Sequence, residues 1–146
     1  MTEAWPYFPI FLKLAGEPVL VVGGGEVALR KVRLLRRAGA RVRLVARELH
    51  PELATLGLAP VAAQFEASLL DGCRLAIAAT DDAALNAGVA RAARERGIPV
   101  NVVDDEAAGT WVSGAIVDRA PVLVAISSGG GAPVLARRLR ERLEAL

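Results

Sequence analysis

Residues 19–31 read VLVVGGGEVALRK, and this stretch decides the fold. Its first four residues are apolar and predict a buried strand, and the three glycines that follow predict a tight turn. A helical pattern begins directly after the turn. Gly23, Gly25 and Ala28 fit the G-x-G-x-x-A pattern of dinucleotide-binding turns. In such turns glycine lets a pyrophosphate approach the backbone at the N-terminus of a helix.

The residues around this turn complete a strand–helix–strand unit. Ala28, Val32 and Leu35 recur at the spacing of one helix face, and the other face is rich in arginine. Gly39 is placed to end this helix, and residues 41–46 alternate like a second strand. A bound dinucleotide is therefore the favoured interpretation, and the alternative is a glycine turn that binds nothing.

Further strands and helices alternate along the chain. Residues 61–65 predict a short strand, and residues 73–79 predict a nearly all-apolar one. Asp81 is placed to cap a helix that Gly97 ends, and residues 98–103 predict the next strand. This alternation predicts an α/β fold with a Rossmann-like parallel sheet and helices on both faces.

The end of the sequence has a different pattern. Residues 111–117 and 121–127 predict the two strands of a hairpin, and Pro133 suits the first turn of a last helix. We therefore expect two parts: a dinucleotide-binding domain over residues 1–112 and a hairpin-plus-helix segment over residues 113–146.

Composition excludes several classes of function. The 146 residues suffice for one core, which is aliphatic because aromatic residues make up only 4% of the chain. No apolar run approaches the ~18 residues that span a bilayer, and a net charge of +2 gives no reason to expect nucleic-acid binding. Cys73 and His50 are the only residues of their types, so a disulfide and a Cys/His zinc site are not expected. Such cysteine usage agrees with a reducing cytoplasm.

Carboxylates remain as candidates for chemistry. Asp81 and Asp82 follow one predicted apolar strand, and Asp104 and Asp105 follow the next. Since ligands of parallel α/β sheets bind at the carboxyl ends of the strands, these residues are predicted to border one site. Asp104 or Asp105 would there supply a base or bind a hard cation. The simpler interpretation is a helix cap for the first pair and a turn for the second.

A second glycine-rich turn, SSGGG at residues 127–131, precedes the last helix. It predicts a second backbone nest for an anion, and the alternative is a hinge. A serine hydrolase is not expected, because the G-x-S-x-G pattern is absent and no histidine is placed to activate Ser128.

Six motifs occur in an order that resembles one family. They are PIFL from Pro9, VVGGGEVALRK from Val21, LAIAATDD from Leu75, NVVD from Asn101, IVDRAP from Ile116 and SSGGGAPVLAR from Ser127. Together they cover almost the whole chain. The sequence resembles the amino-terminal part of siroheme synthase, the precorrin-2 dehydrogenase/sirohydrochlorin ferrochelatase family.

This resemblance implies NAD-dependent dehydrogenation of precorrin-2, a reduced tetrapyrrole with many carboxylates, to sirohydrochlorin. Bifunctional members then insert Fe²⁺ to give siroheme. The resemblance also implies a cytoplasmic homodimer, built through the residues after Asp104. A stripe of Leu135, Leu139 and Leu143 would support such a dimer, and the alternative is that this stripe packs on its own sheet.

The resemblance also assigns roles to residues. Asp104, which ends NVVD, would be the catalytic acid/base, and it would hold the metal ion transiently in a chelatase reaction. The cofactor-binding residues would be Gly23, Gly24, Gly25, Glu26, Val27, Arg47, Glu48, Thr80, Asp81 and Asp82. The residues that bind the tetrapyrrole would be Asn101, Arg119, Ser128, Gly129 and Gly130.

Two features depart from the expected pattern. Arg47 and Glu48 occupy the place where an acid is expected after the second strand. Glu48 would bind the ribose hydroxyls of NAD, which is the favoured cofactor, whereas Arg47 would accept a 2′-phosphate and favour NADP. Family members also continue beyond the position of Leu146 into a helical segment, so we expect this chain to be shortened.

Two other functions remain open. The first is an NAD(H)-sensing regulatory module without catalysis, which would need neither Asp104 nor the turn at residues 127–131. The second is a monofunctional sirohydrochlorin chelatase.

Overall fold

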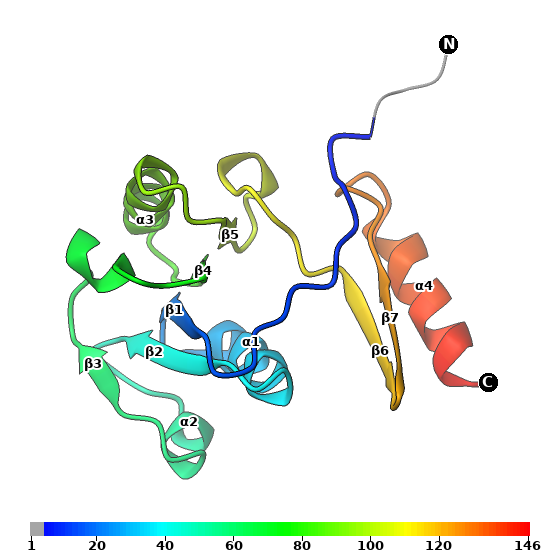
Figure 1. Ribbon diagram of the computed structural model, residues 1–146, viewed down its shortest axis with the longest axis horizontal. Coiled ribbons are helices and arrows are strands. Elements are labelled where there is room, and N and C mark those ends of the chain that lie inside the picture. Colours follow the sequence, from blue (N-terminus) through cyan, green and yellow to red (C-terminus); the bar gives the residue numbers. More distant parts are fainter. Residues whose placement is uncertain (1–4) are drawn as a thin grey trace. The chain divides into compact units, whose positions relative to one another are not determined.

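The computed structural model describes residues 5–146, which form two compact units (Figure 1). One unit comprises residues 11–110, and the other comprises residues 5–10 together with residues 111–146. Each unit has its own packing. No helix among the described residues is long and apolar enough to cross a membrane.

The larger unit contains a five-stranded sheet in which all neighbouring strands are parallel. The spatial order is β3-β2-β1-β4-β5, so the strand order reverses direction between β1 and β4. In sheets of this kind the ligand binds at the carboxyl ends of the strands on either side of that reversal. The strands are β1 (Pro18–Val22), β2 (Arg41–Val45), β3 (Pro60–Ala62), β4 (Leu75–Ala78) and β5 (Val100–Val102).

Helices cover both faces of this sheet (Figure 1). Their bounds are α1 (Glu26–Arg37), α2 (Pro51–Thr55) and α3 (Ala83–Glu95), with 3₁₀ turns η1 (Ala67–Leu70) and η2 (Glu106–Ala108). Leu20 and Val22 share a buried cluster with Val89 of α3. Val19 and Val21 point to the opposite face, because side chains alternate along a strand, and they are also fully buried. The predicted Rossmann-like layers are therefore confirmed.

Two predicted strands have different ends in the structure. The strand expected over residues 61–65 ends at Ala62, because β3 is a short edge strand with an irregular register against β2. The strand expected over residues 73–79 begins at Leu75, because the backbone N–H of Cys73 is used in a turn to the carbonyl of Leu70. The first shift leaves residues 63–65 in a loop at the carboxyl edge of the sheet.

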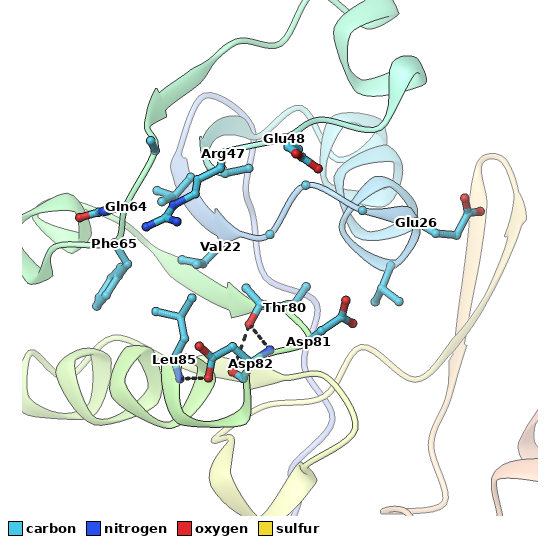
Figure 2. A pocket seen from close by; sticks show the side chains of 18 residues that line it. Val22, Glu26, Arg47, Glu48, Gln64, Phe65, Thr80, Asp81, Asp82 and Leu85 are labelled. Atoms are coloured by element: carbon cyan, nitrogen blue, oxygen red, sulfur yellow. Dashed lines mark hydrogen bonds between the residues drawn. The ribbon is translucent and has the colours of Figure 1, made fainter.

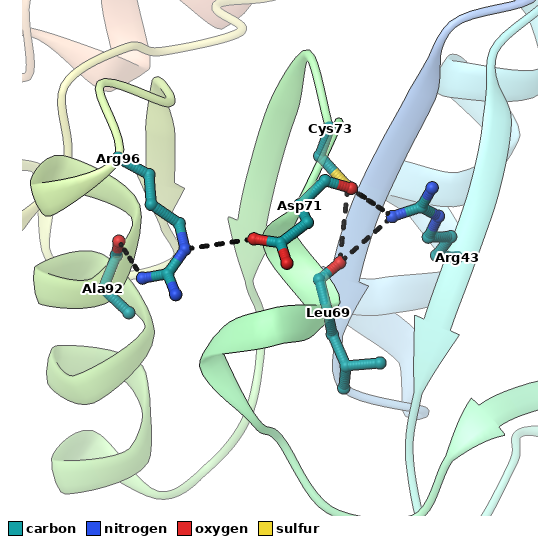
Figure 3. A network of polar contacts seen from close by, with 6 residues as sticks. All are labelled: Arg43, Leu69, Asp71, Cys73, Ala92 and Arg96. Atoms are coloured by element: carbon teal, nitrogen blue, oxygen red, sulfur yellow. Dashed lines mark hydrogen bonds and ion pairs between the residues drawn. The ribbon is translucent and has the colours of Figure 1, made fainter.

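A polar network ties β2 to the segment before β4 and to α3 (Figure 3). Arg43 donates hydrogen bonds to the backbone oxygens of Leu69 (3.3 Å) and Asp71 (2.8 Å). The Asp71 carboxylate pairs with Arg96, the C-cap of α3, at 3.4 Å. Burial raises the pKa of the Cys73 thiol, which donates to the Leu69 oxygen at 3.6 Å. Cys73 is therefore a buried thiol of the core, where cysteine is usually unreactive.

The smaller unit is a hairpin followed by a helix. The strands β6 (Ala115–Arg119) and β7 (Val122–Ile126) pair antiparallel, and α4 (Pro133–Glu144) contacts both. Both strands lie within a few residues of their predicted positions. Leu135 and Leu139 of the predicted stripe are exposed, as are Val122 and Leu123 of β7.

Candidate functional site

A pocket of about 690 Å³ lies at the carboxyl edge of the parallel sheet (Figure 2). Its walls come from the glycine turn after β1 and from the segments that follow β2, β3 and β4. The lining residues are Val22, Gly23, Gly24, Gly25, Glu26, Val27, Val45, Ala46, Arg47, Glu48, Ala63, Gln64, Phe65, Ala79, Thr80, Asp81, Asp82 and Leu85. All ten predicted cofactor-binding residues are among them, and their role in binding stays a prediction.

Backbone hydrogen bonds align the strand ends that carry this pocket. The Gly23 N–H donates to the Val45 oxygen at 2.9 Å, and the Ala79 N–H donates to the Val22 oxygen at 2.8 Å. The Val103 N–H continues the row by donating to the Ala78 oxygen at 3.0 Å. The segments after β2, β1, β4 and β5 therefore begin at one level of the sheet edge.

The three glycines of the turn have different roles. A Cβ atom on Gly23, where φ is +137°, would lie 2.2 Å from the Ala79 oxygen, and one on Gly24 would lie 2.1 Å from the Glu48 oxygen. Both glycines are therefore required by the packing of neighbouring strand ends. A Cβ on Gly25 would meet nothing within 4 Å, so this residue presents bare backbone to open space.

The start of α1 is suited to bind an anion. Gly25 is its N-cap and supplies no side-chain hydrogen bond, and the first helical bond runs from the Leu29 N–H to the Gly25 oxygen. The N–H groups of the first turn therefore have no partner within the helix, and the helix dipole adds positive charge there. Gly25 leaves the approach to them open, so the pocket fits the pyrophosphate of a dinucleotide.

His50 supports the glycine turn through both its backbone and its side chain. Its backbone N–H donates to the Gly24 oxygen, and its Nδ1 accepts from the Glu52 N–H at 3.1 Å, which caps α2. Its Nε2 lies 3.1 Å from a carboxylate oxygen of Glu26. His50 thus holds the start of α1 and the start of α2 together.

Arg47 and Glu48 border the pocket beyond β2, and Figure 2 shows their side chains diverging. The Arg47 guanidinium extends toward Gln64 and Phe65, whereas the Glu48 carboxylate stays near the glycine turn. Sequence reasoning missed Gln64 and Phe65. The predicted strand over residues 61–65 included them. A strand that ended earlier, as β3 does at Ala62, would have placed them at the carboxyl edge of the sheet, where ligands bind.

Thr80, Asp81 and Asp82 form the wall of the pocket after β4. The cap of α3 is Asp82, whose carboxylate accepts from the Leu85 N–H at 3.0 Å, so the prediction that Asp81 is the cap is wrong. The helix begins one residue later than expected, because the Thr80 hydroxyl accepts from the Asp82 N–H at 3.2 Å and holds the preceding turn. The Asp81 side chain is exposed at the pocket.

Asn86 is a buried residue that sequence reasoning missed. Its Oδ1 accepts from the Thr80 hydroxyl (2.6 Å) and the Thr80 N–H (3.2 Å), and its Nδ2 donates to the Thr80 oxygen at 3.0 Å. The signal was a polar residue three and four positions before Val89 and Ala90, which places Asn86 on the apolar face of this helix. Asn86 thereby holds the pocket wall against α3.

Replacing Asn86 with leucine is expected to lower the free energy of unfolding by about 1–3 kcal/mol, because the partly buried backbone groups of Thr80 lose their partners. Urea denaturation measures this change. Arg91→Leu on the exposed face of the same helix is the control and should change stability by less than about 0.5 kcal/mol. Equal stability of the two variants would contradict the assigned role of Asn86.

Asp104 and Asp105 differ sharply in their surroundings. The Asp105 carboxylate accepts from the Ala108 N–H at 3.3 Å and caps η2. Asp104 is exposed, its side chain has no hydrogen bond or ion pair with any described residue, and its backbone has φ +63°. Among residues 5–146 it is the only non-glycine residue with positive φ. Such a conformation is strained and is common at functional sites.

Asp104 does not line the pocket, but it lies just after the end of β5, the strand next to β4. It follows Val103, whose N–H bonds to Ala78, and the residue after Ala78 is part of the pocket wall. Two strand spacings, about 10 Å, separate β5 from the strand that carries the glycine turn. A dinucleotide with its pyrophosphate at Gly25 and its adenosine beyond β2 would extend its other end toward β4 and β5.

The predicted tetrapyrrole-binding residues fall into both units. Asn101 lies buried in β5, whereas Arg119, Ser128, Gly129 and Gly130 belong to the smaller unit. The Ser128 hydroxyl oxygen accepts from the Ala132 N–H at 3.0 Å, and Arg119 donates to the Glu144 oxygen at 2.9 Å. Gly129 and Gly130 have positive φ angles of 64° and 83°, as expected for a glycine turn. Their role in binding a substrate stays a prediction.

No group of three or more His, Cys, Asp and Glu side chains within residues 5–146 is placed to hold a metal ion.

Two family models match the chain. The model described as "Putative NAD(P)-binding" matches residues 10–115, and the model described as "Sirohaem biosynthesis protein central" matches residues 124–146. The first match confirms the predicted class of cofactor.

Curated relatives carry the name siroheme synthase. The protein of Chromobacterium violaceum is 57% identical over 144 residues, which are 96% of this chain and 31% of that protein. The protein of Methylobacillus flagellatus is 56% identical over 142 residues, which are 94% of this chain and 30% of that protein. The chain therefore spans less than a third of the length of these relatives.

A solved structure has a similar fold over nearly the whole chain. It is described as "SirC, precorrin-2 dehydrogenase", and it matches with a TM-score of 0.76 and 27% sequence identity. The match covers 95% of this chain and 70% of that one.

Proposed function

The chain belongs to the NAD(P)-binding family that matches residues 10–115 and is a homologue of the siroheme synthases, and on this premise we propose that it oxidises precorrin-2 to sirohydrochlorin with NAD. The observation that carries this proposal is the environment of the Asp104 carboxylate. This carboxylate is exposed, has no partner among the described residues and lies one strand beyond the wall of the cofactor pocket.

The chain's own residues would bind and orient the cofactor. The first-turn N–H groups of α1 hold the pyrophosphate, and the open backbone at Gly25 lets it approach. Asn86 fixes the turn at Thr80, so the pocket wall toward β5 is formed before the cofactor binds. When bound, NAD supplies a hydride acceptor.

Asp104 would act as the base of the reaction. Oxidation of precorrin-2 removes a hydride and a proton from the substrate, and the proton needs an acceptor. The Asp104 carboxylate accepts it, because its oxygens make no competing hydrogen bond with a described residue. Asp105 is less suited, since its carboxylate already caps η2.

Sirohydrochlorin formation tests this proposal directly. We expect the purified chain to convert precorrin-2 in the presence of NAD⁺, followed by the appearance of sirohydrochlorin absorbance, and to remain inactive without NAD⁺. A folded protein that binds NAD⁺ but gives no turnover would contradict the proposal and favour the cofactor-sensing module.

We further propose that the smaller unit forms a homodimer. Val122, Leu123, Leu135 and Leu139 are exposed apolar side chains of β7 and α4, and a second copy would cover such a surface. A monomer by analytical ultracentrifugation at micromolar concentration would contradict this proposal.

Three further expectations stay predictions. By the family resemblance, Arg119, Ser128, Gly129 and Gly130 would bind carboxylates of the tetrapyrrole. Insertion of Fe²⁺ into sirohydrochlorin would be a second activity, with Fe²⁺ as a substrate held transiently at Asp104. The third expectation is a cytoplasmic location.

A further inference from the structure

One positively charged side chain lines the pocket, and binding of NAD does not require it. Arg47 is the only lysine or arginine among the residues that line it. We propose that Arg47 forms a subsite for the 2′-phosphate of NADP, so that the pocket accepts NADP as well as NAD. This inference rests on the proposed binding of a dinucleotide, and it does not depend on the reaction.

The identity of the residues that follow β2 is compatible with a 2′-phosphate. In dinucleotide-binding strand–helix–strand units a carboxylate near the end of the second strand binds the ribose hydroxyls, whereas a nearby arginine accommodates a 2′-phosphate. Here β2 ends at Val45, and the next residue is Ala46. The Ala46 Cβ lies 2.8 Å from where a Cβ on Gly24 would stand, so this methyl group packs against the glycine turn. A methyl group neither binds the ribose hydroxyls nor repels a phosphate.

The side chains of Arg47 and Glu48 extend in different directions. Figure 2 shows the Arg47 guanidinium extending toward Gln64 and Phe65, and the Glu48 carboxylate on the side of the glycine turn. The pyrophosphate belongs at the glycine turn, so the guanidinium lies on the side where the adenosine would bind. The two opposite charges therefore serve different parts of the pocket.

The Arg47 guanidinium is available to bind a phosphate. Its side chain is exposed, and no hydrogen bond or ion pair joins it to another residue of the described chain. By contrast, Arg33, Arg43, Arg74 and Arg96 of the same unit are all paired. A guanidinium that is not engaged can form two parallel hydrogen bonds to a phosphate without first breaking a contact.

Adenosine bisphosphates test the subsite without any turnover. Adenosine 2′,5′-bisphosphate and 5′-AMP differ only in the 2′-phosphate, and adenosine 3′,5′-bisphosphate is a control of matched charge. By isothermal titration calorimetry we expect the 2′,5′-bisphosphate to bind at least about tenfold more tightly than either, which is typical of one charged hydrogen-bonded contact. Arg47→Ala should abolish this preference while changing the affinity for 5′-AMP by less than about threefold.

Arg91→Ala, which removes an exposed arginine of α3 away from the pocket, should leave the preference intact. Equal binding of the three nucleotides to the unaltered protein, or a preference that survives Arg47→Ala, would overturn the inference. Absence of binding by all three would overturn both the subsite and the proposed cofactor pocket. Binding of the 2′,5′-bisphosphate without precorrin-2 turnover would support the subsite and contradict only the proposed reaction.

Discussion

Asp104→Asn is expected to lower the rate of sirohydrochlorin formation by at least about 100-fold, because general-base catalysis contributes factors of this size. The amide is nearly isosteric with the carboxylate but cannot accept the proton. Asparagine also tolerates the positive φ of 63° at this position, so the backbone conformation should persist. Affinity for NAD⁺ should change by less than about twofold, since Asp104 does not line the pocket.

The neighbouring residue is the matched control for this experiment. Asp105→Asn removes the same charge one position later, and asparagine can still cap η2 by accepting from the Ala108 N–H. We expect Asp105→Asn to keep most of the activity. Turnover that survives Asp104→Asn, or that falls equally in both variants, would show that Asp104 is not the base. The measurement is the initial rate with saturating NAD⁺, accompanied by a titration of NAD⁺ binding.

Gly25→Val is expected to weaken binding of NAD⁺ by at least about tenfold while leaving the protein folded. Gly25 has φ −93° and ψ −161°, an extended conformation that valine adopts readily, and a Cβ there would meet no protein atom within 4 Å. The new side chain would instead occupy the approach to the first-turn N–H groups of α1. Loss of charged hydrogen bonds to a phosphate accounts for the expected size of the effect.

The glycine one residue earlier should show the opposite behaviour. In Gly24→Ala the new Cβ would lie 2.1 Å from the Glu48 oxygen and 2.8 Å from the Ala46 Cβ, so β2 or the turn must move. We expect a loss of about 1–3 kcal/mol in the free energy of unfolding, as for other overpacked sites. Urea denaturation and calorimetric titration separate the two variants. Normal NAD⁺ binding by Gly25→Val would refute the proposed pyrophosphate site.

Much of the candidate site was predictable because its parts are local in sequence. The turn at Gly23–Gly25 and the pairs after β4 and β5 each follow an apolar strand directly. In a parallel sheet, strand ends of the same polarity meet at one edge, so these segments had to converge. The sequence could therefore place Thr80, Asp82 and Asp104 along one edge without knowing any contact.

The roles of individual side chains were not predictable in the same way. Asp104 and Asp105 are adjacent and chemically identical, and only the fold engages one as a cap and leaves the other exposed. Likewise, the role of Asn86 was not predictable, because its hydrogen-bond partner, Thr80, lies in the turn before the helix that carries Asn86. Such distinctions depend on which backbone groups remain unsatisfied after packing.

The sequence by itself determined the class of this protein: a parallel sheet, a glycine turn at the start of a helix, and carboxylates at the edge of the sheet. Periodicity and turn chemistry suffice for that, because both act over a few neighbouring residues. Only the tertiary structure decided that Gly23 and Gly24 serve packing while Gly25 faces open space, and that Arg47 and Glu48 diverge. The difference among the glycines arises from contacts with Ala79, Ala46 and the Glu48 backbone, which the chain brings together only when the sheet has formed.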